Sequence, residues 1–130
     1  MNLLEAELMK GPDVHSDEDH PCCVVCGASY PHVERHHVVF RSQGGGDGPT
    51  LDLCSAGGNG LMDGNGRITC HGAAHHRLLH FRVVDGEWWY LWTKEPTKYE
   101  KALEMDGWLP LRKVPYIRTV AGGDFGEIAY

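Results

Sequence analysis

Four cysteines in the chain have the number and spacing that suit one metal ion. Cys23 and Cys26 form a Cys-x2-Cys pair, and Cys54 and Cys70 follow further along the chain. An x2 spacing brings two sulfurs to one tight turn, and four thiolates complete the tetrahedral shell of a structural zinc ion. Buried cysteines without a metal are the less favoured alternative. Cys22 could replace Cys23, but the x2 spacing favours Cys23. The pattern therefore predicts a structural zinc site.

A second group of residues able to bind a metal consists of histidines. His71 and His75 stand at i and i+4, so on a helix their Cβ atoms lie about 6 Å apart on one face and both imidazoles can reach one ion. His36 and His37 are adjacent and adjoin an expected strand, where successive side chains point to opposite faces. One of this pair can complete a three-imidazole site while the other faces a bound water.

Short regular elements must position these side chains. We expect an N-terminal helix that ends at Gly11-Pro12, a solvated acidic linker, two short strands separated by a glycine-rich loop, a long loop, and a helix with Thr69 as its N-cap. The two helices are expected over residues 2–10 and about 71–79, and the two strands over 38–40 and 51–53. The linker covers residues 13–20, the glycine-rich loop 42–50 and the long loop 55–67.

The C-terminal third has its own local signals. Asp85-Gly86 between two apolar runs, residues 81–84 and 87–92, predicts a two-residue β-hairpin whose tryptophans pack in the core. Residues 97–100 (TKYE) fit a capping box that opens a helix ending at Gly107. The glycine-rich end of the chain is expected to be a loose tail.

Composition indicates a small soluble protein. A chain of 130 residues allows one domain with tails and a modest core. The net charge is −6, yet it is uneven: residues 23–82 carry five arginines against four acids, whereas residues 1–22 carry one lysine against six acids. Five cysteines mixed with nine histidines favour metal binding in a reducing compartment. With no expected signal peptide or membrane span, we expect a cytoplasmic location.

The combined pattern resembles the HNH endonuclease family, whose nuclease domain is called ββα-metal or His-Me finger. The resemblance covers roughly residues 22–80. It implies that His37 is the general base, that three other histidines hold a catalytic divalent ion, and that the four cysteines form the zinc knuckle of many standalone members. The matching segments are Cys23-x2-Cys26, ERHHVVFRSQGG over residues 34–45, Leu53-Cys54 and Cys70-His71-x3-His75, and the implied ligands of the catalytic ion are His36, His71 and His75.

The chain departs from the family pattern at one place. Residues 48–50 (GPT) stand where the family has its middle Asn. In the family this Asn braces the loop behind the general base, so another residue must hold that loop here. Asn59 or Asn65 could substitute. His76 and His80 form another i, i+4 pair, which we interpret as solvated or packing residues. Arg41 and Arg77 are candidates for phosphate contact, since a guanidinium matches a phosphate in a fork.

The expected fold is α+β: a small zinc-stapled ββα-metal domain over residues 22–82, an acidic N-terminal extension over residues 1–21, and a hairpin, short helix and tail over residues 83–130. The resemblance implies a metal-dependent DNA endonuclease that nicks by phosphodiester hydrolysis, with structural Zn²⁺ and one catalytic ion (Mg²⁺, Mn²⁺, Ni²⁺ or Zn²⁺). DNA is the implied partner of a monomer or weak dimer without membrane contact, and standalone phage and prophage members suggest phage packaging proteins as further partners. The alternative is a non-catalytic zinc module that binds nucleic acid or protein, which leaves the histidines unexplained.

Overall fold

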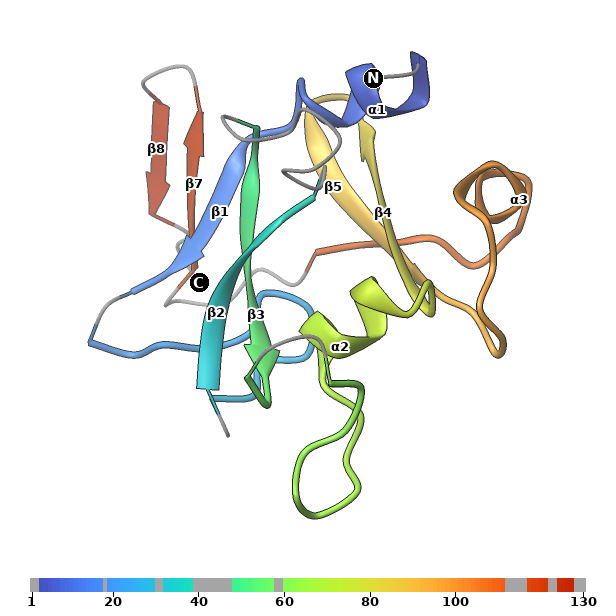
Figure 1. The fold of residues 1–130 in the computed structure, drawn as a ribbon. Coiled ribbons are helices and arrows are strands. Elements are labelled where there is room, and N and C mark those ends of the chain that lie inside the picture. The colour runs from blue at the N-terminus through green and yellow to red at the C-terminus, as the bar shows by residue number, and fades with distance from the viewer. Residues whose placement is uncertain are drawn as a thin grey trace.

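The computed structural model describes residues 3–17, 19–29, 32–38, 48–57, 60–111, 117–121 and 124–127. This part of the chain forms two small sheets and three short helices, an α+β arrangement (Figure 1). None of these helices is long and apolar enough to cross a bilayer. The elements are α1 (Leu3–Leu8), β1 (Asp13–Ser16), β2 (His32–His37), β3 (Thr50–Ser55), α2 (Cys70–His75), β4 (Leu79–Val84), β5 (Glu87–Trp92), α3 (Tyr99–Leu103), β6 (Leu109–Pro110), β7 (Ile117–Ala121) and β8 (Asp124–Glu127).

The larger sheet has the strand order β2-β3-β1-β7-β8. β2 runs antiparallel to β3, β1 joins β3 in parallel, and β7 runs antiparallel to β1. Two expectations are therefore wrong. Residues 13–16 form a strand rather than a solvated linker, and the C-terminal segments of 117–121 and 124–127 are strands rather than a loose tail. The acidic β1 is accommodated because its Asp13 carboxylate accepts a hydrogen bond from the Thr50 backbone N–H at 2.7 Å.

The strand beside the paired histidines lies earlier than expected. β2 covers residues 32–37, so His36 and His37 are its last two residues, and Val38 follows in a bend. The expected strand over 38–40 is thus wrong at Val38, while residues 39–40 and most of the glycine-rich loop lie outside the described residues. β3 matches the expected strand over 51–53 and extends it by one residue toward the N-terminus and two toward the C-terminus.

Helix α2 begins as predicted and ends early. The Thr69 hydroxyl accepts a hydrogen bond from the Gly72 N–H at 3.1 Å, which confirms the N-cap. The helix ends at His75 because Arg77 adopts a left-handed conformation with φ of 61°. The N–H of Leu78 bonds the Ala73 carbonyl and that of Arg77 bonds the Ala74 carbonyl, the two bonds of a Schellman motif.

The smaller sheet pairs β4 with β5 and β5 with β6. The predicted hairpin is confirmed: Asp85 and Gly86 have φ of 52° and 79°, as a type I′ turn requires. The predicted capping box is wrong, since Lys98 rather than Thr97 occupies the N-cap of α3 and makes no side-chain cap bond. Thr97 instead donates its hydroxyl hydrogen to the Glu95 carbonyl at 2.7 Å. The helix ends at Leu103, four residues before the predicted end.

One apolar core joins both sheets and the cysteine segments. Leu51 and Leu53 of β3 are fully buried in it with Val24. Trp88 of β5 is buried as predicted, and its indole Nε1–H donates to the Pro12 carbonyl at 2.6 Å, which ties the hairpin to the N-terminal segment. The same prediction is wrong for Trp92, which is 42% exposed. Helix α2 packs against both β3 and β4 (Figure 1). The core thus fixes α2 relative to the β2–β3 pair.

Two candidate metal centres

The four predicted cysteine ligands converge. The sulfurs of Cys23, Cys26, Cys54 and Cys70 all lie within 4.8 Å of one another, so these residues are positioned to hold a metal ion. The Cys26 and Cys54 sulfurs are 3.7 Å apart, which agrees with the separation of about 3.8 Å between two sulfurs on one tetrahedral zinc. They come from three segments: the turn at residues 23–26, strand β3 and the first residue of α2.

Backbone N–H groups surround these sulfurs. Val25 and Cys26 donate to the Cys23 sulfur at 3.4 and 3.5 Å, and Cys70 donates to the Cys54 sulfur at 3.2 Å. Gly27 permits this tight turn with φ of 81°. Such donors stabilise thiolates, the form that binds metal.

The sulfurs also share protons. The hydrogen bond with Cys23 lowers the pKa of the Cys26 thiol to about 6, and hydrogen bonds from the other cysteines lower the pKa of Cys54 as well. The same hydrogen bonds raise the pKa values of Cys23 and Cys70. Metal binding must displace the protons that remain on the cysteines.

Cys22 lies outside the quartet. It is buried, at 8% exposure, and does not belong to the group of converging ligands. All five cysteines are in the described part of the chain, and none forms a disulfide. The prediction that Cys23 rather than Cys22 joins the group is confirmed.

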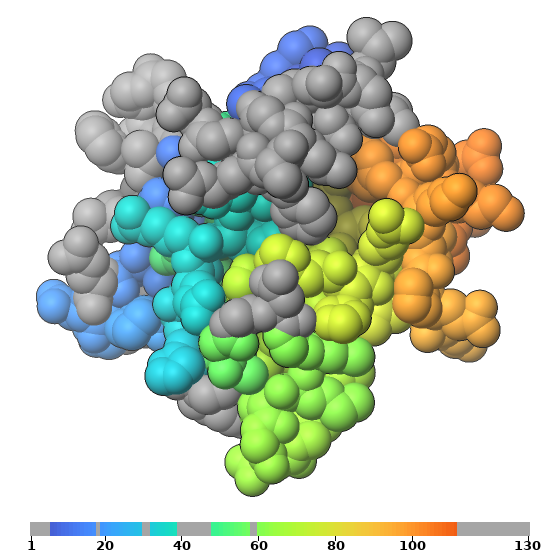
Figure 2. All heavy atoms as spheres, in the orientation of Figure 1, coloured from blue at the N-terminus to red at the C-terminus, as the bar shows by residue number. Residues whose placement is uncertain are grey.

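Three of the four predicted histidines form a second group. The ring nitrogens of His36, His71 and His75 all lie within 4.8 Å of one another. The Nε2 atoms of His71 and His75 are 3.1 Å apart, within the range of about 3.0 to 3.4 Å for two nitrogens on one ion. The His36 ring stands edge-on to both, with centroids 5.2 and 5.3 Å away. In Figure 2, β2 and the α2 segment that carry these residues lie side by side.

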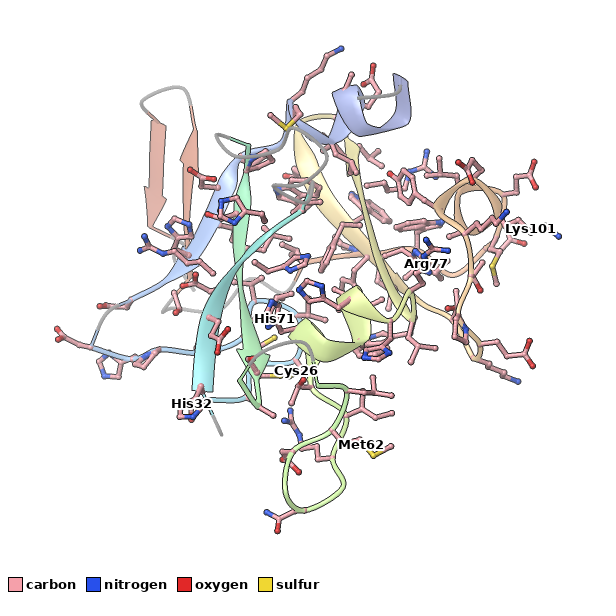
Figure 3. The ribbon with its side chains drawn as sticks, in the orientation of Figure 1. Cys26, His32, Met62, His71, Arg77 and Lys101 are labelled. Carbon is pink, nitrogen blue, oxygen red and sulfur yellow. The ribbon has the colours of Figure 1, made fainter. Side chains whose placement is uncertain are left out.

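The second ring nitrogen of His71 has its own partners. Its Nδ1 lies 3.0 Å from the Ser55 hydroxyl oxygen and 3.6 Å from a Glu34 carboxylate oxygen. The Ser55 oxygen also accepts a hydrogen bond from the Gly57 N–H at 3.0 Å, which fixes its position. A proton on Nδ1 would be donated to the Ser55 oxygen, with the Glu34 carboxylate nearby, and would leave the Nε2 lone pair free for an ion. Figure 3 labels His71 at the start of α2.

All three imidazoles favour the neutral, metal-binding form. Burial, with the neighbouring His71 and His75, lowers the pKa of His36 to about 3. Burial also lowers the pKa values of His71 and His75, although Glu34 opposes the shift at His71. A neutral imidazole offers a lone pair, so at neutral pH protons compete little with a cation for this site.

His37 is separated from this group by the alternation of β2. His36 pairs with Leu51 and is buried at 3% exposure, whereas His37 pairs with Thr50 and is half-buried. Paired residues share a face of the sheet, so the two adjacent histidines face opposite sides, as predicted. Beside His37, the Thr50 hydroxyl lies 2.7 Å from Nε2 of His15, a histidine that the sequence patterns did not single out.

The remaining sequence candidates are placed as follows. Arg77 is exposed directly after α2, and Arg41 lies outside the described residues. Asn65 is exposed in the loop before α2, and Asn59 also lies outside the described residues. The interpretation of His76 and His80 as solvated or packing residues is confirmed, since His76 is exposed and His80 is buried. Their expected i, i+4 relation on one helix is wrong, because α2 ends at His75 and His80 belongs to β4.

Sequence reasoning missed the residues that surround the ligands. Glu34 lies two residues before His36, so strand alternation alone places both on the same face. Ser55 directly follows Cys54, but only the contact between β3 and α2 brings it to His71. Arg67 lies in the loop that carries no pattern, and its contact with the sulfurs requires the folded chain.

Comparison with known proteins adds no family to these observations. A scan against protein-family models and searches of curated proteins and of solved structures found no significant match. The geometry of the two centres is therefore the basis for a functional conclusion.

Proposed function

We propose that the protein is a metal-dependent DNA endonuclease of the HNH type. The observation that carries the proposal is the convergence of His36, His71 and His75, three neutral imidazoles from one strand and one helix. The order of the elements, the antiparallel pair β2–β3 followed by α2, agrees with a ββα-metal arrangement. A cysteine site on β3 and α2 agrees with the zinc knuckle of that family.

The chemistry of the donor set fits a catalytic ion. His36, His71 and His75 would hold a divalent ion, which would supply Lewis-acid stabilisation of the charge that grows on a phosphate during hydrolysis. Ser55 and Glu34 orient one of these imidazoles, that of His71. A set of neutral ligands also leaves the full charge of the ion for the phosphodiester.

His37 is assigned the role of general base on the strength of the HNH resemblance. It is the last residue of β2, adjacent to the ligand His36 and half-buried. It is not in the converging group, so it is available to take a proton from water rather than to bind the ion. Arg77, exposed after α2, and Arg41 are assigned to phosphate contact.

A plasmid-cleavage assay with Mg²⁺, Mn²⁺, Ni²⁺ and Zn²⁺ tests the proposal. We expect His37→Ala to abolish cleavage and to retain the metal content of the native protein. His76→Ala is the matched control, since His76 lies next to the ligand His75 but outside the converging group, and it should cut normally. Loss of the catalytic metal in His37→Ala would mean that the roles of His36 and His37 are exchanged.

The charge distribution predicts the form of cleavage. One ββα-metal unit would carry one base and one ion, so we expect a monomer to cut one strand per encounter, with nicked circles before linear DNA. The weakly basic segment neutralises few phosphates, so this cleavage should be slow. Activity should fall between about 50 and 200 mM salt, and less steeply than for a strongly basic protein, because the slope follows the number of phosphates neutralised. A preparation that binds one metal per chain and cuts no DNA with any of the four ions would favour the non-catalytic zinc module.

A further inference from the structure

The segment before α2, residues 61–69, folds into a small hairpin beside the cysteine centre. Met62 pairs with Ile68, and the Thr69 N–H donates to the Leu61 carbonyl at 3.0 Å. Met62 is 51% exposed and Ile68 41% exposed, so burial of these two side chains does not account for the hairpin. It projects from the body of the protein below α2 (Figures 2 and 3).

A carboxylate organises the tip of this hairpin. Asp63 accepts hydrogen bonds through one oxygen from the N–H groups of Asn65 and Arg67, at 2.8 and 3.0 Å. Its own N–H donates to the Arg67 carbonyl at 2.9 Å. The backbone of Arg67 is therefore held from both sides, and its side chain leaves the hairpin from a fixed position.

The Arg67 side chain reaches two sulfurs of the cysteine centre. Its Nη2 group lies 3.4 Å from the Cys26 sulfur and 3.6 Å from the Cys54 sulfur, as a donor to both. Cys26 is the exposed member of the quartet, whereas the other three cysteines are buried. The guanidinium thus lies against the ligand that water and competing chelators can reach first.

The contact between Arg67 and the sulfurs would offset the negative charge of a metal-loaded cysteine centre. Four thiolates on one divalent ion carry a net charge of about −2. Backbone N–H groups offer only partial charges, whereas a guanidinium carries a full positive charge, and hydrogen bonds to charged groups are the stronger kind. A cation beside Cys26 stabilises its metal-bound thiolate and therefore opposes dissociation of this ligand.

We propose that Arg67 is a positioning residue of the cysteine centre, and that the hairpin over 61–69 exists to hold its guanidinium on the sulfurs. Arg67 balances the thiolate charge and slows the release of the metal through Cys26. The inference rests on metal binding by the cysteines and not on nuclease activity, so its failure and the failure of the proposed function are separate results.

The test uses Co²⁺ in the cysteine centre, because sulfur-to-cobalt charge-transfer absorption reports on this site and not on the histidines. The rate at which EDTA removes the absorption is measured for the native chain and for Arg67→Gln, Arg67→Lys, Asp63→Ala and Asn65→Ala. We expect removal to be roughly three- to tenfold faster in Arg67→Gln, the effect of losing a partly exposed charge-assisted bond. Arg67→Lys should release cobalt more slowly than Arg67→Gln but faster than the native chain. The release rate of Asp63→Ala should lie between those of Arg67→Lys and Arg67→Gln.

Asn65→Ala is the matched control. Its backbone N–H bonds to Asp63 whatever the side chain, so it should release cobalt at the native rate. Salt provides a check that needs no variant: screening should accelerate release from the native chain and change Arg67→Gln little. The proposal is overturned if Arg67→Gln releases metal at the native rate, if Arg67→Lys is as fast as Arg67→Gln, or if no charge-transfer absorption develops.

Discussion

Replacing Gly72 by alanine should destabilise the protein, although alanine is usually the better helix residue. Gly72 lies within α2, where alanine is favoured over glycine by about 1 kcal/mol. A Cβ atom at this position, however, would lie 2.3 Å from the Gly60 carbonyl oxygen and 2.8 Å from the Leu61 Cα. Both are backbone atoms, so no side-chain rotation relieves the contact. The helix and the segment at 60–61 must separate by on the order of 1 Å.

The size of the effect follows from what this separation disturbs. Overpacking of this kind costs about 1–3 kcal/mol. The bond from the Thr69 N–H to the Leu61 carbonyl, 3.0 Å long, also lengthens and adds about 1 kcal/mol. After the gain in helix propensity, we expect a net loss of roughly 1–3 kcal/mol in the free energy of unfolding. For a chain of this size, that lowers the Tm by about 4–12 °C.

Thermal unfolding at saturating Zn²⁺ measures the change. Gly64→Ala is the matched control, since a Cβ there would have nothing within 4 Å, and it should stay within about 0.5 kcal/mol of the native protein. Displaced helix residues should also weaken metal binding at the histidines, because α2 carries His71 and His75 whereas β2 carries His36. A Gly72→Ala protein at least as stable as the native chain would refute the close packing of 60–61 on α2.

Four further outcomes can be measured. Cys54→Ser should lose the metal and several kcal/mol of stability, whereas Cys22→Ser should keep the native metal content by elemental analysis. Ser55→Ala should keep the fold and lower the affinity of the histidines for a divalent ion by about 10- to 100-fold, as measured by calorimetry. Arg77→Gly should raise the unfolding free energy by up to about 1 kcal/mol, since glycine suits its left-handed φ, yet should slow DNA cleavage. The pKa of His36, about 3, lies below its ordinary value of 6.5. The stabilisation that comes from a neutral His36 is therefore present above about pH 6.5 and is lost, by up to about 5 kcal/mol, as the pH falls toward 3. In denaturant titrations over this pH range, the free energy of unfolding of the native chain should fall relative to that of His36→Gln, and a relative rise would contradict the assignment.

Local chemistry explains what the sequence allowed us to predict. Cysteine quartets are uncommon, and an x2 pair restricts the geometry so strongly that the ligands can be named before the fold is known. His71 and His75 need only one helical turn to meet, and that turn is capped by the adjacent Thr69. The Asp85-Gly86 turn is likewise specified by two residues.

The elements that could not be predicted depend on distant partners. β1 and β7 are strands because they pair with each other, and β1 also pairs with β3, although the sequence around Asp13 is acidic. The early end of α2 results from Arg77 in a conformation that sequence rules assign to glycine. Arg67 gave no signal because its partners, Cys26 and Cys54, come from other segments.

The two candidate centres are joined in α2 by a single peptide bond. Cys70 belongs to the cysteine group and His71, the next residue, to the histidine group, and both are in the first turn of α2. Cys54 and Ser55 repeat this arrangement on β3: the first contributes a sulfur, and the second contacts Nδ1 of His71. A metal on the sulfurs therefore fixes β3 against α2 and, with it, the orientation of the imidazole. If the histidines hold an ion as proposed, metal at the cysteines would help to keep His71 in place, because the two residues' segments share α2 and β3.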